Sequence, residues 1–191
     1  MARLPYLSPE DLAESDRDLL KRPITLHRCL VNSTGAARAF GGLGQYIRFG
    51  SKLNPRLREL AILQVGWLAR SAYEWSHHIK IGREFGVTDA DVRGLIADTA
   101  GEPNELEPLA RLVLKGTREV FGGGMSAGTF AALHDRLGAE TMVDLTVTTS
   151  FYCAVVRTLE TLAIDVEPEY QAFLDVHPLP CSAGSRAAQA T

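Results

Sequence analysis

The fold of this chain is decided by residues 53–87, which read LNPRLRELAILQVGWLARSAYEWSHHIKIGREFGV. Asn54 followed by Pro55 is typical of a helix start, because an asparagine side chain caps the first turn and proline suits the first helical position. The spacing of apolar residues predicts one helix over residues 55–69 and a second over residues 72–85. A short turn between them would fold the two helices back against each other as a hairpin.

Two acids and an imidazole fall on the faces of these helices that should point inward. At about 100° per residue, Glu74 and His78 share the inward face of the second helix and are spaced so that their side chains can touch. Glu59 is surrounded on its own helix by apolar residues, and the hairpin would bring it towards the other two. Carboxylates and imidazoles that are shielded from solvent have shifted pKa values, and groups whose pKa lies near neutral pH transfer protons best. We therefore predict a proton-transfer site at Glu59, Glu74 and His78. The opposite, solvent-facing side of the second helix is expected to carry Ser76, Lys80, Arg83 and Glu84.

Simpler roles stay open for the same residues. Glu59 could be an early-turn acid favoured by the helix dipole. Glu74 and His78 could form a structural pair at a subunit interface. Glu74, His77 and His78 offer metal ligands, but adjacent histidines point about 100° apart on a helix, so we expect no metal. Trp75 suits core packing at least as well as a ligand platform.

The rest of the chain predicts further helices and no run of alternating strands. We expect a helix from Ser8 that ends before Pro23, and a loop over residues 98–104. Residues 1–177 are expected to form a single all-α domain, and residues 178–191, rich in Ala, Ser and Pro, a frayed tail. The other expected helices cover about residues 36–49, 89–97, 105–120, 126–136, 139–164 and 168–175.

Length, charge and cysteine content exclude several classes of protein. The 191 residues suit one domain, and 46% hydrophobic with 23% charged residues is an ordinary globular composition. The net charge of -3 gives no electrostatic footprint for nucleic acid or an anionic membrane. Cys29, Cys153 and Cys181 form neither a zinc pattern nor a disulfide framework. Without a signal peptide or an apolar span, a cytoplasmic location is expected.

The hairpin segment resembles the carboxymuconolactone decarboxylase family, which includes the alkylhydroperoxidase AhpD-like proteins. The resemblance is carried by Asn54-Pro-x-x-x-Glu59-Leu, then Tyr73-Glu74-Trp-x-x-His78, then Gly86-Val87. AhpD-like peroxidases have C-x-x-C followed four residues later by histidine, and a glutamate twelve residues before the first cysteine. The register fits here without gaps, with Ser71 and Glu74 at the two cysteine positions.

This resemblance implies a fold and an activity. The fold would be an AhpD-like helical bundle built around a central helical hairpin and assembled into trimers or hexamers. The activity would be that of the branch without the cysteine pair, which works by acid–base chemistry without a cofactor. The substrate would be a small carbonyl compound, such as a carboxylated lactone, that reacts through an enolate-like intermediate. Glu59, Glu74 and His78 would be the catalytic residues, and the residues expected to contact substrate are Ser71, Trp75, His77 and His27.

Two other functions compete with this interpretation. A peroxidase-like reductase would need a thiolate and a resolving thiol, which Ser71 and Glu74 do not supply, so it would have to use Cys29 or Cys153. A non-catalytic oligomeric binding protein would keep only the fold. Candidates to hold an anionic substrate are, by charge alone, Arg48, Arg70 and Arg157.

Overall fold

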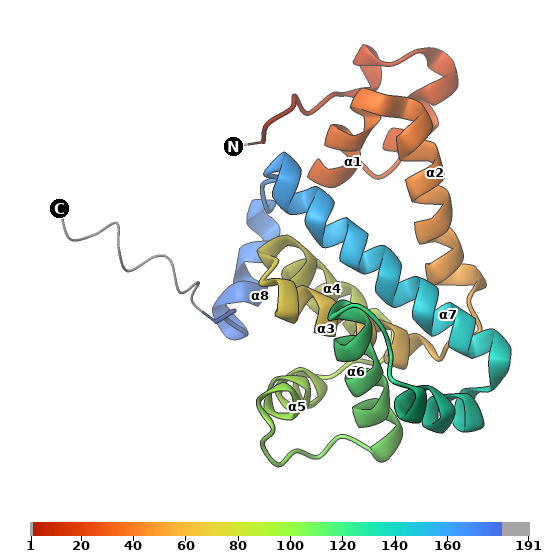
Figure 1. The fold of residues 1–191 in the computed structure, drawn as a ribbon. Helices are drawn as coiled ribbons and strands as arrows, with labels where there is room; N and C mark the ends of the chain where they lie inside the picture. Colours follow the sequence, from red (N-terminus) through yellow and green to blue (C-terminus); the bar gives the residue numbers. More distant parts are fainter. Residues whose placement is uncertain (1, 181–191) are drawn as a thin grey trace.

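The structure, a computed structural model, describes residues 2–180. These residues form helices and turns and no strand, which confirms the expected all-α class (Figure 1). Most of the predicted tail, residues 178–191, lies outside the described residues. The α-helices are α1 (Thr25–Leu30), α2 (Thr34–Gln45), α3 (Pro55–Ala69), α4 (Ala72–Glu84), α5 (Asp89–Ala100), α6 (Pro108–Phe121), α7 (Ala127–Leu162) and α8 (Gln171–Val176).

The predicted hairpin of α3 and α4 is the centre of the fold. The Asn54 side chain accepts hydrogen bonds from the first backbone N–H groups of α3, and the Ser71 hydroxyl accepts one from the Glu74 N–H of α4. Between the helices, Arg70 takes the left-handed conformation with φ 53°, which reverses the chain. A side chain at Gly66 would start 3.3 Å from the backbone nitrogen of Trp75, so glycine permits the close approach of the two helices.

Helix α3 is buried on nearly all sides. It packs against α4, α6 and α7, and its residues Leu57 to Gly66 are all buried. A helix covered all round must be apolar or have its polar groups paired. The charged residues of α3 that are buried, Arg58 and Glu59, must therefore have partners inside the protein.

The N-terminal prediction is wrong, because two short 3-10 helices, Pro9–Asp11 and Glu14–Leu20, replace the single helix expected from Ser8. Within this segment, Leu12 and Leu20 pack against α2 in a small apolar cluster that is separate from the main core. Helix α2 itself continues into a π-helical turn, Tyr46–Gly50. The remaining short 3-10 helices are Val31–Ser33 and Pro168–Tyr170.

The other predicted boundaries agree with the structure to within a few residues. Gly138, where the sequence predicts a break, has φ 74° and interrupts the helical geometry of α7. Helix α5 runs on to Ala100, so the predicted loop starts later, and α6 begins at Pro108 rather than Glu105. None of the helices in residues 2–180 has the length and apolar character needed to cross a membrane.

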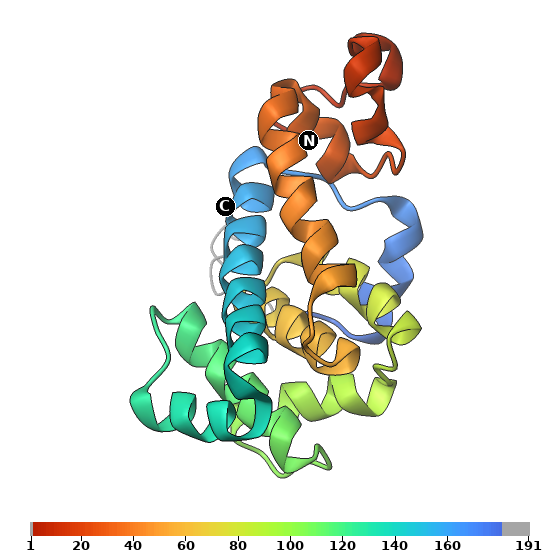
Figure 2. The ribbon, with the colours of Figure 1, turned by 90° about the vertical axis from the view of Figure 1, so that its right-hand side faces the viewer.

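Two outer segments close over the hairpin. Helix α2 leans along α7, where the rings of Phe40 and Phe151 lie 4.7 Å apart (Figure 2). On the other side, α8 and the turn before it pack on α4. Ser76 on α4 is fully buried, which corrects its expected solvent exposure, whereas Lys80, Arg83 and Glu84 are exposed as expected. Assembly into trimers or hexamers stays a prediction.

Candidate active site

Glu59, Glu74 and His78 meet between α3 and α4, as the sequence predicts. His78 Nδ1 donates a hydrogen bond of 2.7 Å to Glu59 Oε2, and His78 Nε2 lies 2.9 Å from Glu74 Oε1. The exposed fractions are 1% for Glu59, 3% for Glu74 and 7% for His78. The imidazole is thus clamped between two buried carboxylates, one from each helix of the hairpin.

Arg58 completes this charge cluster and was not singled out in the sequence. Its Nε and Nη2 atoms donate to Glu59 Oε1 at 3.1 and 3.0 Å, and its Nη1 donates to the Arg48 carbonyl at 3.0 Å. The guanidinium also stacks over the Phe85 ring, 4.5 Å from the centroid. A buried arginine inside an apolar helix is the signal that could have found it, because such a charge needs an acid beside it.

The cluster shifts the pKa values of its members. Burial raises the pKa of Glu59, but the charges of His78 and Arg58 outweigh burial and hold this pKa below its usual range. Burial lowers the pKa of His78, but the nearby carboxylates of Glu74 and Glu59 outweigh it and raise this pKa to about 9. His78 is therefore an imidazolium at neutral pH, and the cluster holds two positive and two negative charges.

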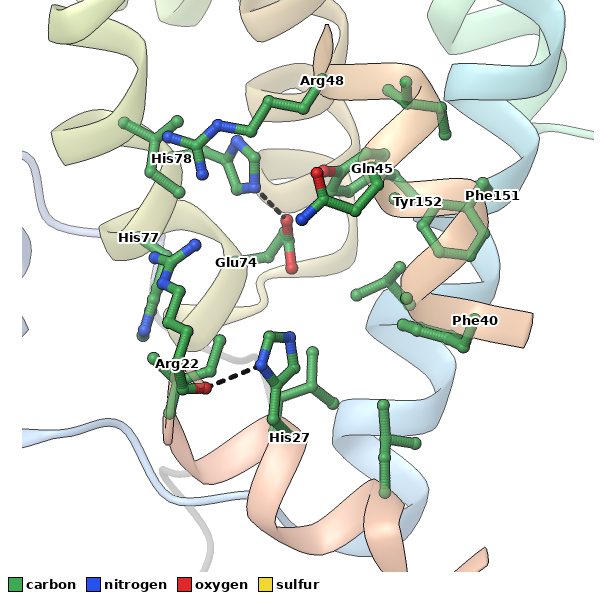
Figure 3. Close-up of a pocket in the computed structure, with 18 of the residues that line it drawn as sticks. Arg22, His27, Phe40, Gln45, Arg48, Glu74, His77, His78, Phe151 and Tyr152 are labelled. Atoms are coloured by element: carbon green, nitrogen blue, oxygen red, sulfur yellow. Dashed lines mark hydrogen bonds and ion pairs between the residues drawn. The ribbon is translucent and has the colours of Figure 1, made fainter. Parts of the chain in front are cut away.

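Glu74 differs from Glu59 in having an incomplete set of partners. Its Oε1 is buried and close to His78 Nε2, but it lies outside the direction of a well-formed hydrogen bond and has no other partner among residues 2–180. Figure 3 shows the second carboxylate oxygen pointing away from His78 into the space between α4 and α1. Glu59 also borders the cavity, but its two carboxylate oxygens are held by Arg58 and His78, so Glu74 is the acid with an oxygen left for a bound molecule.

A cavity of about 840 Å³ opens in front of Glu74 and His78. It lies between α1, α2, α4 and α7, and its volume suits a small organic molecule (Figure 3). Near the charge cluster the cavity wall includes Gln45 and Arg48. No sequence motif indicates Gln45, and Arg48 was a candidate by its charge alone. The apolar part of the wall is formed by Ile24, Leu26, Leu30, Phe40, Phe151, Tyr152 and Val155.

Two residues predicted to contact substrate do not line this cavity. Ser71 caps α4, and its hydroxyl accepts a hydrogen bond from the Glu74 backbone N–H. Trp75 is fully buried in the main core, where its indole N–H donates a 2.8 Å hydrogen bond to the His177 carbonyl. The structure therefore places neither residue at this cavity, and for Trp75 the reason is that the helix rotation that turns Glu74 and His78 to the cavity turns Trp75 into the core.

The two predicted histidines do line the cavity, in different settings. His27 donates from Nδ1 to the Arg22 carbonyl at 2.8 Å. His77 is stacked between Tyr73 and Tyr170, with ring centroids 4.0 and 3.6 Å away. Its Nδ1 lies 2.9 Å from the Tyr73 carbonyl and its Nε2 lies 3.1 Å from Glu167 Oε2. His77 is thereby tied into the framework of the cavity.

Neither described cysteine belongs to the site. Cys29 and Cys153 are buried and free, and burial raises the pKa of both thiols, which disfavours the reactive thiolate. Neither lines the cavity. Cys181 lies outside the described residues. Within residues 2–180, no group of three or more His, Cys, Asp and Glu side chains is arranged to hold a metal ion.

The raised pKa of His78 predicts a loss of stability at alkaline pH. The folded state stabilises the protonated form of His78. Its contribution to the free energy of unfolding is therefore complete below the unfolded pKa of about 6.5 and is lost as pH rises towards about 9. This difference between the unfolded and folded pKa values of His78 corresponds to roughly 3 kcal/mol of unfolding free energy. Urea unfolding at several pH values should show this decline in the wild type, and His78→Gln should flatten it. An equal decline in His78→Gln would assign the effect to other groups.

Comparisons with known proteins agree with this architecture. A sequence model described as the carboxymuconolactone decarboxylase family matches residues 35–107, which include all but the first residue of α2, the hairpin and α5. A search of curated proteins finds no match. An uncharacterized peroxidase-related protein from Ralstonia eutropha JMP134, described as an alkylhydroperoxidase AhpD core, superposes with a TM-score of 0.76 at 18% identity, over 91% of this chain and 95% of that one.

Two further solved structures share the fold. An uncharacterized peroxidase-related protein from Silicibacter sp. TM1040 has a TM-score of 0.71 at 17% identity, over 88% of this chain and 92% of that one. A cysteine-to-alanine variant of the debrominase Bmp8, in complex with 2,3,4-tribromopyrrole, has a TM-score of 0.73 at 16% identity, over 92% and 99%. At these identities the likeness shows the AhpD-like fold and leaves the chemistry to the residues of this chain.

Proposed function

Because this chain belongs, through residues 35–107, to the carboxymuconolactone decarboxylase family, we propose that it is a cofactor-independent acid–base enzyme. It acts on a small carbonyl compound, such as a carboxylated lactone, through an enolate-like intermediate. The reaction is a decarboxylation or a double-bond isomerisation, both of which need a proton placed on or removed from carbon.

The observation that carries this proposal is the Glu74 carboxylate at the cavity wall, backed by the imidazolium of His78. His78 Nε2 and Glu74 Oε1 are 2.9 Å apart, so a small rotation of either side chain aligns them for proton transfer, and Glu74 can then act as acid or base towards a bound molecule. Glu59 and Arg58 do not meet the substrate in this scheme. They hold the imidazole in place and keep the cluster neutral, so that proton transfer needs little rearrangement.

In a decarboxylation, the bond between the ring and the carboxyl carbon breaks and CO₂ leaves. The electron pair stays in the ring and is delocalised onto the carbonyl oxygen as an enolate. Carbon then takes a proton from Glu74, which is resupplied by His78. In an isomerisation, the enolate forms instead by loss of a proton from the carbon beside the carbonyl.

Arg48 is the predicted arginine best placed to hold an anionic substrate. It lines the cavity, and its buried Nε has no hydrogen-bond partner in the described part of the chain, although its Nη2 pairs with Glu84 at 3.3 Å. Arg157 instead donates to the Cys153 carbonyl, and neither it nor Arg70 lines the cavity. A guanidinium with a free N–H suits a carboxylate.

Two lactones in D₂O test the proposal. Carboxymuconolactone should lose CO₂, or the carboxyl-free α-angelica lactone should shift its double bond, with deuterium entering on carbon. Proton NMR follows both reactions. Failure of both compounds to react faster than in buffer would contradict the proposed function. A thiol mechanism predicts instead that alkylation of the cysteines stops any activity, and the buried positions of Cys29 and Cys153 oppose it.

A further inference from the structure

We propose that His27 is a second catalytic residue of this cavity, a general base that takes a proton from the substrate on the wall opposite Glu74. The inference rests on the proposed function and adds to it a division of labour. His27 removes a proton from carbon, and the His78–Glu74 pair supplies one. His27 comes from α1, outside the segment that matches the family.

The hydrogen bond to Arg22 determines which nitrogen of His27 is free. A carbonyl oxygen only accepts, so the Nδ1 atom 2.8 Å from the Arg22 oxygen must carry a hydrogen. In the neutral ring Nε2 then has a lone pair. Nothing within residues 2–180 is hydrogen-bonded to Nε2. Figure 3 shows the nitrogen that does not face Arg22 directed towards the Glu74 carboxylate. A molecule between α1 and α4 would therefore meet His27 on one side and Glu74 on the other.

Helix α1 is attached firmly enough to keep His27 in this position. The Thr25 backbone N–H donates to Glu167 Oε1 at 2.7 Å, and the Leu26 N–H donates to the Tyr73 hydroxyl at 3.3 Å. These two contacts anchor the first turn of α1 to α4 and to the segment that precedes α8. A base placed by anchored elements needs little reorganisation to react.

The surroundings of His27 and His78 shift the pKa values of these two residues in opposite directions. Burial, the largest influence, lowers the pKa of His27 and outweighs the raising effect of the hydrogen bond to the Arg22 carbonyl. The charge of Arg22 lowers this pKa further, and the charge of Glu167 raises it slightly. His27 is thus neutral at pH 7, whereas His78 is protonated. Groups whose pKa values are pushed apart in this way are suited to act as base and acid in one reaction. Glu74 faces His27 across the cavity and is the other charged group to consider.

On α-angelica lactone the steps balance. His27 Nε2 takes a proton from the carbon beside the carbonyl, and the electron pair of that C–H bond forms the enolate. The ring carbon at the far end of the conjugated system then takes a proton from Glu74, as His78 gives its proton to Glu74. Water in the cavity returns the proton from His27 to His78, which restores the starting state.

The test compares His27→Asn with the wild type in the lactone assay. Asparagine keeps an N–H donor at the position of Nδ1 but has no basic nitrogen in place of Nε2. We expect turnover to fall about 10²-fold with little change in KM, and the loss of rate on acidification to disappear. Imidazole in solution should restore turnover to His27→Ala. His134→Asn, which alters an exposed histidine outside the cavity, should match the wild type.

A second measurement needs no turnover. Nitrogen-15 NMR of histidine-labelled protein, with His27→Asn to assign the signals, should find His27 at pH 7 with hydrogen on Nδ1 only. A His27 that is protonated at Nε2 would overturn the proposal. So would unchanged turnover in His27→Asn, which would leave the proposed function intact. A wild type inactive on both lactones would instead reject the proposed function and with it the catalytic role of His27.

Discussion

Replacing Glu74 with glutamine is expected to lower kcat on a reactive lactone by about 10²–10⁴-fold while KM changes little. The substitution keeps the size of the side chain but removes the atom that takes up and releases the proton at the cavity wall. It also removes one of the two carboxylates that raise the pKa of His78, so the imidazole should lose its proton at lower pH. Steady-state kinetics and histidine NMR measure the two effects separately.

Two controls make this result specific. Glu140→Gln removes an exposed carboxylate of α7 that does not line the cavity, and it should leave kcat unchanged. Glu74→Asp keeps the carboxylate but withdraws it from the cavity and from His78, so it should recover part of the lost rate. If Glu74→Gln turned over as fast as Glu140→Gln, Glu74 would have no catalytic role.

Replacing Arg58 with methionine is expected to destabilise the protein by about 3–5 kcal/mol, as the removal of one partner from a buried ion pair does elsewhere. Glu59 would lose both hydrogen bonds to its Oε1 while remaining 1% exposed in the fold. The charge cluster would also change from neutral to a net negative charge. Urea unfolding at pH 7 measures the loss.

The matched control for this substitution is Arg83→Met. Arg83 pairs with Asp89 at 2.9 Å, but both side chains are about half exposed, so its removal should change stability by less than about 1 kcal/mol. Combining Arg58→Met with Glu59→Gln removes both charges of the buried pair and should restore part of the stability. Equal effects of Arg58→Met and Arg83→Met would show that the buried cluster does not support the fold.

Local patterns were sufficient to predict the hairpin and the meeting of Glu59, Glu74 and His78. Asn54 and Ser71 act as caps through hydrogen bonds to their own first turns, so their meaning can be read from neighbouring residues alone. The contact between Glu74 and His78 follows from helical spacing, and the position of Glu59 follows once the second helix folds back. All of these features depend on residues within the segment 53–87.

Contacts between distant segments account for the predictions that failed. Ser76 was expected on the surface, but it is fully buried in α4, a helix against which α3, α8 and the turn before α8 all pack. The hydrogen bond from Trp75 to the His177 carbonyl joins residues more than a hundred positions apart, and no local pattern indicates it. The same holds for Glu167, which binds α1 and α4 together.

The sequence by itself determined an all-helical chain with a central hairpin and a carboxylate–imidazole cluster, because caps, helical period and one-turn spacing act over a few residues. Only the tertiary structure decided that the cluster opens onto a cavity, that Arg58 neutralises it, and that His27 faces Glu74 from another helix. These features arise where α1, α2, α4 and α7 pack together. Burial and the pairing of charges depend on that packing, so they exist only in the folded chain.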